Sequence, residues 1–236
     1  MENKLMTHIV AGYPTMKKCE ERAMEFARKG VEFIEIQIPF SDPVADGPVI
    51  MKACEQSLNN GTKVKDCFKL MKKLSVGFEK EGLKTSLLFM TYFNIAHKYG
   101  VQKFCKDSKQ AGAYGLIIPD IPLNEETSEG YIKSCEENNL NPIQVISTIT
   151  PEERLEKISK VARGFVYCVS RYGTTGAKSE LNPKLKSYLD KARKFINLPL
   201  AVGFGISSRA QIDAVHKHSE IAVIGSALIE GGSGLL

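Results

Sequence analysis

The sequence of 236 residues contains no apolar stretch of the roughly 20 residues that a membrane-spanning helix needs. Its first ten residues, MENKLMTHIV, contain no apolar leader segment. It also contains no basic run with interleaved aromatic residues, a pattern typical of nucleic-acid-binding proteins. Although the formal charge is +5, the basic and acidic residues are scattered along the whole chain. These absences predict a cytoplasmic protein with no membrane partner and no nucleic-acid partner.

Patterns typical of metal binding are missing as well. The chain has six cysteines but no Cys-x-x-Cys pair, and its four histidines do not cluster at the spacing of metal ligands. We therefore expect free and mostly buried thiols in a reducing compartment, and no metal site.

Short apolar runs rich in β-forming residues recur along the chain. They lie at residues 5–11, 31–37, 84–89, 115–118, 142–146, 165–169, 199–203 and 220–224. Segments with helical periodicity lie between them, for example at 15–30, 62–74, 151–164 and 207–218. The alternation predicts an α/β protein with a parallel sheet. Eight strands in a chain of this length predict a single (β/α)8 TIM-barrel domain over residues 1–236, with a doubly wound open sheet as the alternative.

The second predicted strand carries an acid in an otherwise apolar segment. Side chains alternate along a strand, so Ile34 and Ile36 would face the outer helices while Glu35 would face the barrel interior. An isolated buried carboxylate is costly in its charged form, a condition that suits a group that both gives and takes protons. The alternative is that Glu35 faces solvent or pairs with a buried basic residue. A second acid, Asp46, follows in the next loop.

Glycine-containing segments follow the last two predicted strands, "GFGISS" at 203–208 and "IGSAL" at 224–228. Backbone N–H groups at a helix start bind anions, and barrels of this kind often bind phosphate after strands seven and eight. A plain turn explains any one of these glycines equally well. Two such loops side by side predict a sugar-phosphate site, without identifying its substrate.

The segment "IEIQIPFSDPVADGPVI" at 34–50 resembles the signature of the tryptophan synthase alpha chain family, whose pattern is close to E-L-G-x-P-F-S-D-P-x-A-D-G-P. Further loops agree with the family in order along the chain: AGYP (11–14), SLNNGT (57–62), MTYFN (90–94), IPDIP (118–122), SRYGTTG (170–176), VGFGIS (202–207) and IGSAL (224–228). The resemblance therefore covers nearly the whole chain.

The resemblance implies a lyase of tryptophan biosynthesis that cleaves indole-3-glycerol phosphate into indole and glyceraldehyde 3-phosphate by a retro-aldol step. Glu35 matches the general acid–base, and Asp46 matches the carboxylate that accepts the indole N–H. Tyr167 matches a tyrosine near the reacting centre, although it is equally explained as a packing residue. The substrate-binding positions implied are Ile50, Tyr92, Thr175, Gly176, Gly203, Phe204, Gly205, Gly225 and Ser226.

The resemblance also implies a partner. The family's alpha chain works in an alpha-beta-beta-alpha heterotetramer, and Asp42 and Pro43 match positions that contact the beta subunit. Pyridoxal phosphate is expected only in that subunit, and no cofactor or metal in this chain. The polar segment 171–182 would close over the ligand, with Thr175 bonding to Asp46.

The sequence departs from the family pattern at two inner positions and at both ends. Gln37 stands where glycine is usual, so it would narrow the site or bond to a ligand or loop, and His8 replaces an apolar aromatic residue. The N-terminal and C-terminal helices are expected to be shortened, which would expose the outer faces of the first and last strands. Two alternative functions follow: a catalytically weak alpha-like chain that binds ligand and activates a beta subunit, or a different sugar-phosphate barrel enzyme.

Overall fold

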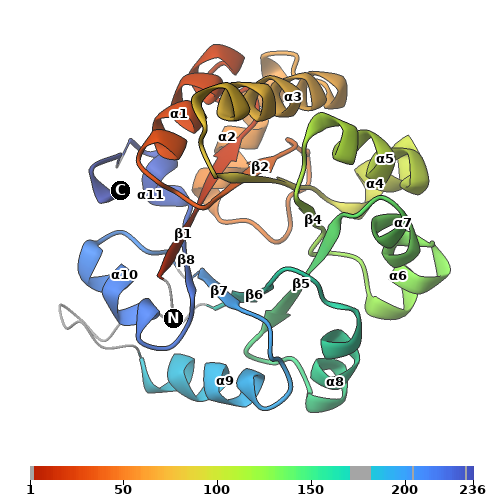
Figure 1. The fold of residues 1–236 in the computed structure, drawn as a ribbon, viewed down its shortest axis with the longest axis vertical. Coiled ribbons are helices and arrows are strands. Elements are labelled where there is room, and N and C mark those ends of the chain that lie inside the picture. The colour runs from red at the N-terminus through yellow and green to blue at the C-terminus, as the bar shows by residue number, and fades with distance from the viewer. Residues whose placement is uncertain (1–2, 171–181, 204, 232) are drawn as a thin grey trace.

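The computed structural model describes residues 3–170, 182–203, 205–231 and 233–236. Within these ranges eight parallel strands, in chain order, form a closed barrel (Figure 1). The strands are β1 (Lys4–Val10), β2 (Phe33–Gln37), β3 (Ser86–Met90), β4 (Gly115–Ile117), β5 (Asn141–Ser147), β6 (Val166–Val169), β7 (Leu200–Gly203) and β8 (Ile221–Ile224). Because β1 pairs with both β2 and β8, the predicted (β/α)8 TIM barrel is confirmed and the open sheet is wrong.

Helices surround the barrel on the outside (Figure 1). In the described part of the chain they are α1 (Met16–Arg28), α2 (Pro48–Asn59), α3 (Val64–Glu81), α4 (Phe93–Tyr99), α5 (Val101–Ala111), α6 (Leu123–Ser128), α7 (Tyr131–Glu137), α8 (Glu152–Val161), α9 (Pro183–Arg193), α10 (Arg209–His216) and α11 (Ser226–Ile229), followed by a 3-10 turn (Ser233–Leu235). Helix α1 shows how local sequence sets these bounds. The side chain of Thr15 accepts the Lys18 N–H at 3.2 Å and so begins the helix, while Ala23 and Phe26 are buried against the barrel.

The predicted alternation along β2 is confirmed. Ile34, Ile36 and Ile38 belong to the large apolar core between the barrel and its helices. Phe33 packs instead against a second apolar cluster, which includes Met6, Leu88 and Phe165 and fills the barrel interior. The register with β1 aligns Glu35 with His8, so both side chains lie on the inner wall.

The outer faces of the first and last strands are covered, and the expectation that they are exposed is wrong. Helices α1, α2 and α11 contact β1, and α10 packs on β8. As a result Ile9, Ala222 and Ile224 belong to the buried core between strands and helices. Helix α11 spans only four residues, in agreement with the shortened C-terminal helix, yet it is long enough to cover β1.

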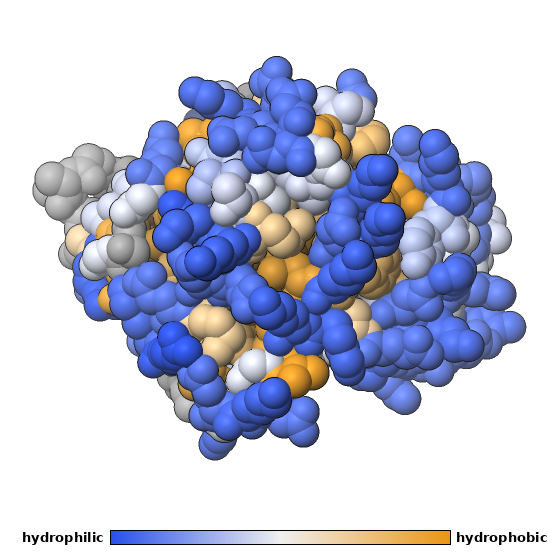
Figure 2. All heavy atoms as spheres, turned by 90° about the horizontal axis from the view of Figure 1, so that it is seen from above, coloured by the Kyte–Doolittle hydropathy of each residue, from blue (hydrophilic) through white to orange (hydrophobic). Residues whose placement is uncertain are grey.

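The surface is mostly polar. In Figure 2 hydrophilic residues predominate on the face viewed from above, and apolar residues show in separate areas between them. All six cysteines are free and buried, as the sequence predicted. Within the described ranges, no helix combines the length and apolar character that crossing a bilayer requires.

Gly12, in the loop after β1, occupies a position that admits no side chain. Its φ is +83°, and a Cβ there would lie 2.1 Å from Thr62 Oγ1 and 2.5 Å from Ser57 Oγ. Ser57 is fixed because its hydroxyl donates to the Ala11 carbonyl. We expect Gly12→Ala to lower the free energy of unfolding by about 3–4 kcal/mol, from backbone strain together with the clash.

The matched control is Gly82→Ala, which changes a glycine with a similar φ of +67° and open space around it. Backbone strain alone predicts a loss of about 1–2 kcal/mol for Gly82→Ala. Urea unfolding of both variants separates the two contributions, and equal losses would contradict the steric argument.

Glu126 on α6 is a buried acid outside the barrel interior. Its carboxylate accepts hydrogen bonds from Gln144 Nε2 at 2.9 Å and 3.2 Å, and burial raises its pKa to about 7 against the partial opposition of Gln144 and Arg154. The folded state therefore holds this proton at a pH where the unfolded chain has released it. The resulting stabilisation is complete below the ordinary pKa of 4.5 and is lost as pH rises through about 7.

We therefore expect Glu126→Gln, which cannot titrate, to gain stability relative to the parent protein between pH 5 and pH 8. The expected gain is on the order of 2–3 kcal/mol. Urea midpoints at four pH values measure it, and the exposed neighbour substitution Glu125→Gln is the control. A difference between parent and Glu126→Gln that does not change with pH would contradict the assignment.

Candidate active site

A cavity of about 360 Å³ lies at the carboxyl-terminal ends of the barrel strands. Eight of the residues expected in the site line it: Glu35, Asp46, Ile50, Tyr167, Gly203, Gly205, Gly225 and Ser226. Three more expected residues, Thr175, Gly176 and Phe204, lie outside the described residues. A pocket of this size suits a small ligand, and its residues come from the barrel end where such enzymes place their chemistry.

Glu35 projects from β2 into the cavity and is 2% exposed. It is not isolated, because His8 Nδ1 lies 3.2 Å from Glu35 Oε1 and His8 is itself buried. The alternative in which Glu35 faces solvent is therefore wrong, and the one in which it pairs with a buried basic residue is correct. Burial opposes protonation of His8, but the Glu35 carboxylate outweighs it and, with Asp46 and Gln37, raises the pKa of the imidazole.

Asp46 lies in the loop after β2 and is held from two sides. Gln37 Nε2 donates to Asp46 Oδ2 at 2.6 Å, and the Tyr92 hydroxyl donates to the same oxygen at 2.8 Å. The Ala45 N–H donates to the Tyr92 hydroxyl, so the loop backbone fixes this tyrosine as well. Of the two roles considered for Gln37, bonding to a loop is therefore the one observed.

Tyr92 is fully buried and stacks on Phe40 at 5.2 Å between ring centroids. The sequence predicted that Tyr92 contacts the ligand, but Tyr92 does not line the cavity. Its hydroxyl instead donates to Asp46, which does. Burial and the neighbouring Asp46 raise its pKa, so the phenol keeps the proton that it donates.

Tyr167 projects from β6 into the same cavity, and its position explains one of the glycines. A Cβ on Gly203 would lie 3.0 Å from the Tyr167 hydroxyl and 3.3 Å from its ring. Burial, with the charges of Glu35 and Asp46, raises the pKa of Tyr167 well above that of free tyrosine. The phenol therefore keeps its proton and is available as a hydrogen-bond donor.

The glycine end of the cavity is built by β7 and β8. Gly205 has a φ of +79° and no neighbour within 4 Å of a hypothetical Cβ, so it is required by its conformation. Gly225 and Ser226 stand at the start of α11, where the first backbone N–H groups of a helix have no partner within it. This arrangement offers donors to an anion, and the sugar-phosphate site stays a prediction.

The loop after β2 also carries the expected partner-contact residues. Asp42 is exposed and accepts a hydrogen bond from the Ser41 hydroxyl, whereas Pro43 is buried.

Asp120, after β4, accepts the Phe93 N–H at 2.8 Å and thereby caps α4.

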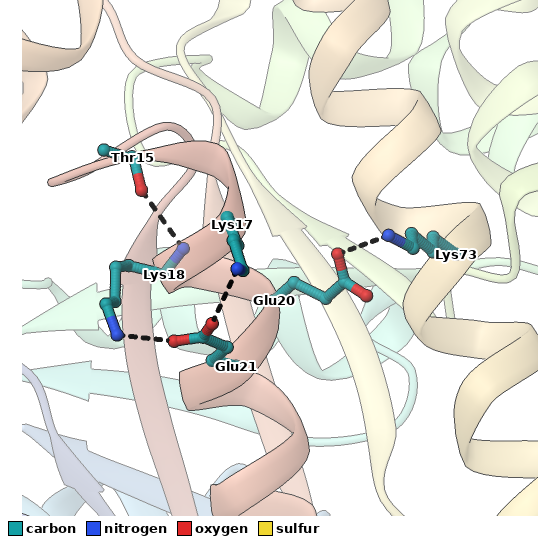
Figure 3. A network of polar contacts seen from close by, with 6 residues as sticks. All are labelled: Thr15, Lys17, Lys18, Glu20, Glu21 and Lys73. Atoms are coloured by element: carbon teal, nitrogen blue, oxygen red, sulfur yellow. Dashed lines mark hydrogen bonds and ion pairs between the residues drawn. The ribbon is translucent and has the colours of Figure 1, made fainter.

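A larger groove of about 940 Å³ lies on the outside of the barrel between α1, α2 and α3. Its charged side chains pair with one another: Lys73 bonds to Glu20 at 2.6 Å, and Lys17 lies 3.9 Å from Glu21 (Figure 3). These pairs are accessible to solvent and mutually neutralised, in contrast to Glu35 in the cavity, which is 2% exposed. The chemistry therefore belongs to the smaller cavity.

Metal-binding groups do not gather in the part of the chain that the structure describes: no three His, Cys, Asp or Glu side chains there lie close enough to hold an ion.

Among the described residues, the sequence did not identify His8 and Gln37 as partners of the two acids. The signal was present, since alternation along β1 places His8 on the inner face together with Met6.

Comparison with known proteins agrees with this geometry. The family model of the tryptophan synthase alpha chain matches residues 1–232. The tryptophan synthase alpha chain of Desulfotalea psychrophila is 43% identical over 225 residues, which is 95% of this chain and 86% of that protein. That of Desulforapulum autotrophicum is 41% identical with the same coverage.

Solved structures agree as well. A tryptophan synthase alpha-subunit from Pyrococcus furiosus superposes with a TM-score of 0.86 at 29% identity, covering 97% of this chain and 89% of that one. A chain of tryptophan synthase from M. tuberculosis gives 0.87 at 27% identity, covering 99% and 86%. The resemblance inferred from the loops is thereby confirmed over the whole barrel, and the chain belongs to the tryptophan synthase alpha chain family.

Proposed function

We propose that this chain cleaves indole-3-glycerol phosphate to indole and glyceraldehyde 3-phosphate, with Glu35 as the general acid–base. The family is a lyase family of tryptophan biosynthesis, and membership in it supports the reaction. The observation that carries the assignment is the pair of acids, Glu35 and Asp46, on the wall of one cavity. In the proposal Glu35 protonates the indole C3 carbon and helps to remove the proton of the side-chain hydroxyl. Asp46 accepts the indole N–H and stabilises the positive charge that develops on the ring.

The remaining residues of the cavity would hold the substrate. Gly203, Gly205, Gly225 and Ser226 would bind the phosphate through backbone N–H groups, together with Gly176 and Phe204. Ile50 would contact the indole ring, and Thr175 would bond to Asp46 in the closed site. Tyr167 would donate a hydrogen bond near the reacting centre. The acids and the glycines line one cavity, so a single substrate with an indole and a phosphate could contact both.

We further propose that the chain works with a tryptophan synthase beta subunit in an alpha-beta-beta-alpha complex, and that residues 1–236 form one domain. The exposed apolar side chains support a protein partner. Val44 in the loop after β2 is 82% exposed and Ile149 after β5 is 88% exposed, and both loops leave the strands at the cavity end. Asp42 would contribute to the same surface. Pyridoxal phosphate would belong to the beta subunit alone, and the complex would be cytoplasmic.

Two observations favour the lyase over the alternatives. Both acids line the cavity although Gln37 stands where glycine is usual, which favours a catalytic chain over a catalytically weak alpha-like one. The loop motif that carries Asp46, which Gln37 and Tyr92 hold in place, favours this reaction over that of a different sugar-phosphate enzyme.

The test supplies indole-3-glycerol phosphate to the purified chain and follows indole release, alone and with a beta subunit. We expect slow release by the chain alone and faster release with the partner. No release under either condition would rule out the proposed reaction, and release that no beta subunit stimulates would rule out the proposed coupling.

A further inference from the structure

The inner wall of the barrel carries a row of buried polar side chains beside the two acids. His8 on β1 is 4% exposed and Gln37 on β2 is fully buried, next to Glu35. Neither His8 nor Gln37 has an assigned role in the reaction proposed above. Buried polar groups of this kind destabilise a fold unless they bond to something, so their partners indicate what they do.

Each of these residues contacts one oxygen of one acid. His8 Nδ1 lies 3.2 Å from Oε1 of Glu35. Gln37 Nε2 donates to Oδ2 of Asp46 at 2.6 Å, and Tyr92 donates to that same oxygen. The contacts involve a single oxygen of each carboxylate, so each acid retains a second oxygen outside them.

The atoms that remain point to a ligand. Glu35 Oε2 is buried and has no hydrogen-bond partner among the described residues; His8 Nε2 and Gln37 Oε1 meet no partner within hydrogen-bond geometry there, although the Gln37 side chain is close enough to raise the pKa of His8. His8 and Glu35 line the cavity, so a polar ligand atom that enters it can satisfy their unpartnered atoms. Leaving a buried polar atom unpaired is destabilising, and a ligand that bonds to the atom removes that cost.

We propose that His8 and Gln37 are positioning residues that each hold one oxygen of a catalytic acid and turn the other oxygen toward the substrate. His8 fixes Glu35 through Oε1, which leaves Oε2 for proton transfer. Gln37, supported by Tyr92, fixes Asp46 through Oδ2, which leaves Oδ1 for the ring N–H. This inference rests on the proposed function for its consequences in turnover, but the pairing itself is independent of the reaction.

The charges around His8 agree with this arrangement. Glu35 faces it from β2 and Asp46 from the following loop, while Tyr167 on β6 lines the same cavity and stays neutral. The two carboxylates raise the pKa of the imidazole, and its Nδ1 lies within hydrogen-bond reach of Glu35 Oε1. The rotamer of Glu35 is thus set before the substrate arrives.

The first experiment needs no substrate. The titration of the His8 imidazole is followed by NMR in the unliganded protein and in Glu35→Gln, with His8→Phe to assign the signal. We expect the His8 midpoint to fall by at least about one pH unit in Glu35→Gln, because the charge that holds its proton is gone. The same midpoint in both proteins would overturn the pairing whether or not the chain cleaves indole-3-glycerol phosphate.

The second experiment measures turnover in three variants. His8→Phe keeps an aromatic ring but removes the donor, and we expect kcat to fall about 10- to 100-fold with KM changed much less, because a misplaced acid slows chemistry more than binding. His8→Asn places an amide near Nδ1 and should restore part of the rate while flattening the pH dependence that the imidazole contributes. Gln37→Met, similar in size but without a donor, should lower kcat by about 10-fold.

The control is His97→Phe, the same substitution at a histidine on α4 that is 61% exposed and makes no contact with either acid. Binding of glycerol 3-phosphate to each variant, measured by calorimetry, shows whether the site is still folded. Loss of rate in His8→Phe that His8→Asn does not relieve, or a kcat and pH profile equal to those of the parent, would overturn the positioning role. If the parent chain itself releases no indole, the proposed function fails, and the NMR titration still decides the pairing.

Discussion

Glu35→Gln is expected to lower kcat for indole release by about 1,000-fold, within the range usual for a positioned acid–base group. The amide has nearly the shape of the carboxyl group, and its oxygen can still accept the His8 Nδ1–H, so the cavity should keep its form. The amide cannot exchange a proton with the indole C3 carbon or with the side-chain hydroxyl. KM should therefore change little while kcat collapses. Steady-state assays of indole release, with and without a beta subunit, measure both constants.

A suitable control for this substitution is Glu126→Gln, which changes a buried glutamate that does not line the cavity. We expect that variant to keep the parent's kcat. Turnover by Glu35→Gln equal to that of the parent would remove Glu35 from the mechanism, and a similar loss in both variants would indicate a general effect of altering buried acids.

Asp46→Asn is expected to lower kcat by about 100-fold, since a neutral group stabilises the developing charge on the ring far less than a carboxylate does. Gln37 and Tyr92 can still donate to the amide oxygen, so the loop should keep its place. The amide nitrogen would then face the ring N–H. Because both groups are hydrogen-bond donors, they cannot bond to each other, and indole itself should bind more weakly. Equilibrium dialysis with indole measures that loss separately from the rate.

The control for Asp46→Asn is Asp42→Asn in the same loop, where the side chain is exposed. Assayed without a beta subunit, this variant should release indole at the parent's rate. Equal rates for Asp46→Asn and the parent would exclude the proposed role for that carboxylate.

The sequence predicted the barrel because its strands are short, apolar and regularly spaced. Alternation along β2 correctly placed Glu35 inside, since one strand's pattern is sufficient to decide which face a residue takes. The same reasoning could not show that His8 lies opposite Glu35, because register between two strands is a property of the pair. Nor could it show that Gln37 bonds to Asp46, which depends on how the loop after β2 folds back over the strand.

The shorter helices were also beyond the reach of periodicity. Helices α4 and α5 meet at Gly100, and α6 and α7 are separated by Gly130, so several of these elements span only one or two turns. Such lengths do not establish a 3.6-residue pattern. The exposure expected for β1 and β8 was wrong for a related reason: a four-residue helix after β8 was too short to be recognised, yet it covers β1.

All eight strands contribute residues to the cavity, but its acids and its glycines come from opposite ends of the sequence. Glu35 and Asp46, with His8 and Gln37, lie within the first 50 residues, and the glycines that follow β7 and β8 lie within the last 40 or so. The pairing of β1 with β8 joins these two parts of the chain. Until β1 pairs with β8, for example Lys4 with Ile221, a nascent chain leaving the ribosome has the acids of the site but not the glycine loops beside them. A ligand that contacts both the acids and the glycine loops binds only the closed barrel. Its binding free energy would therefore stabilise the β1–β8 pairing.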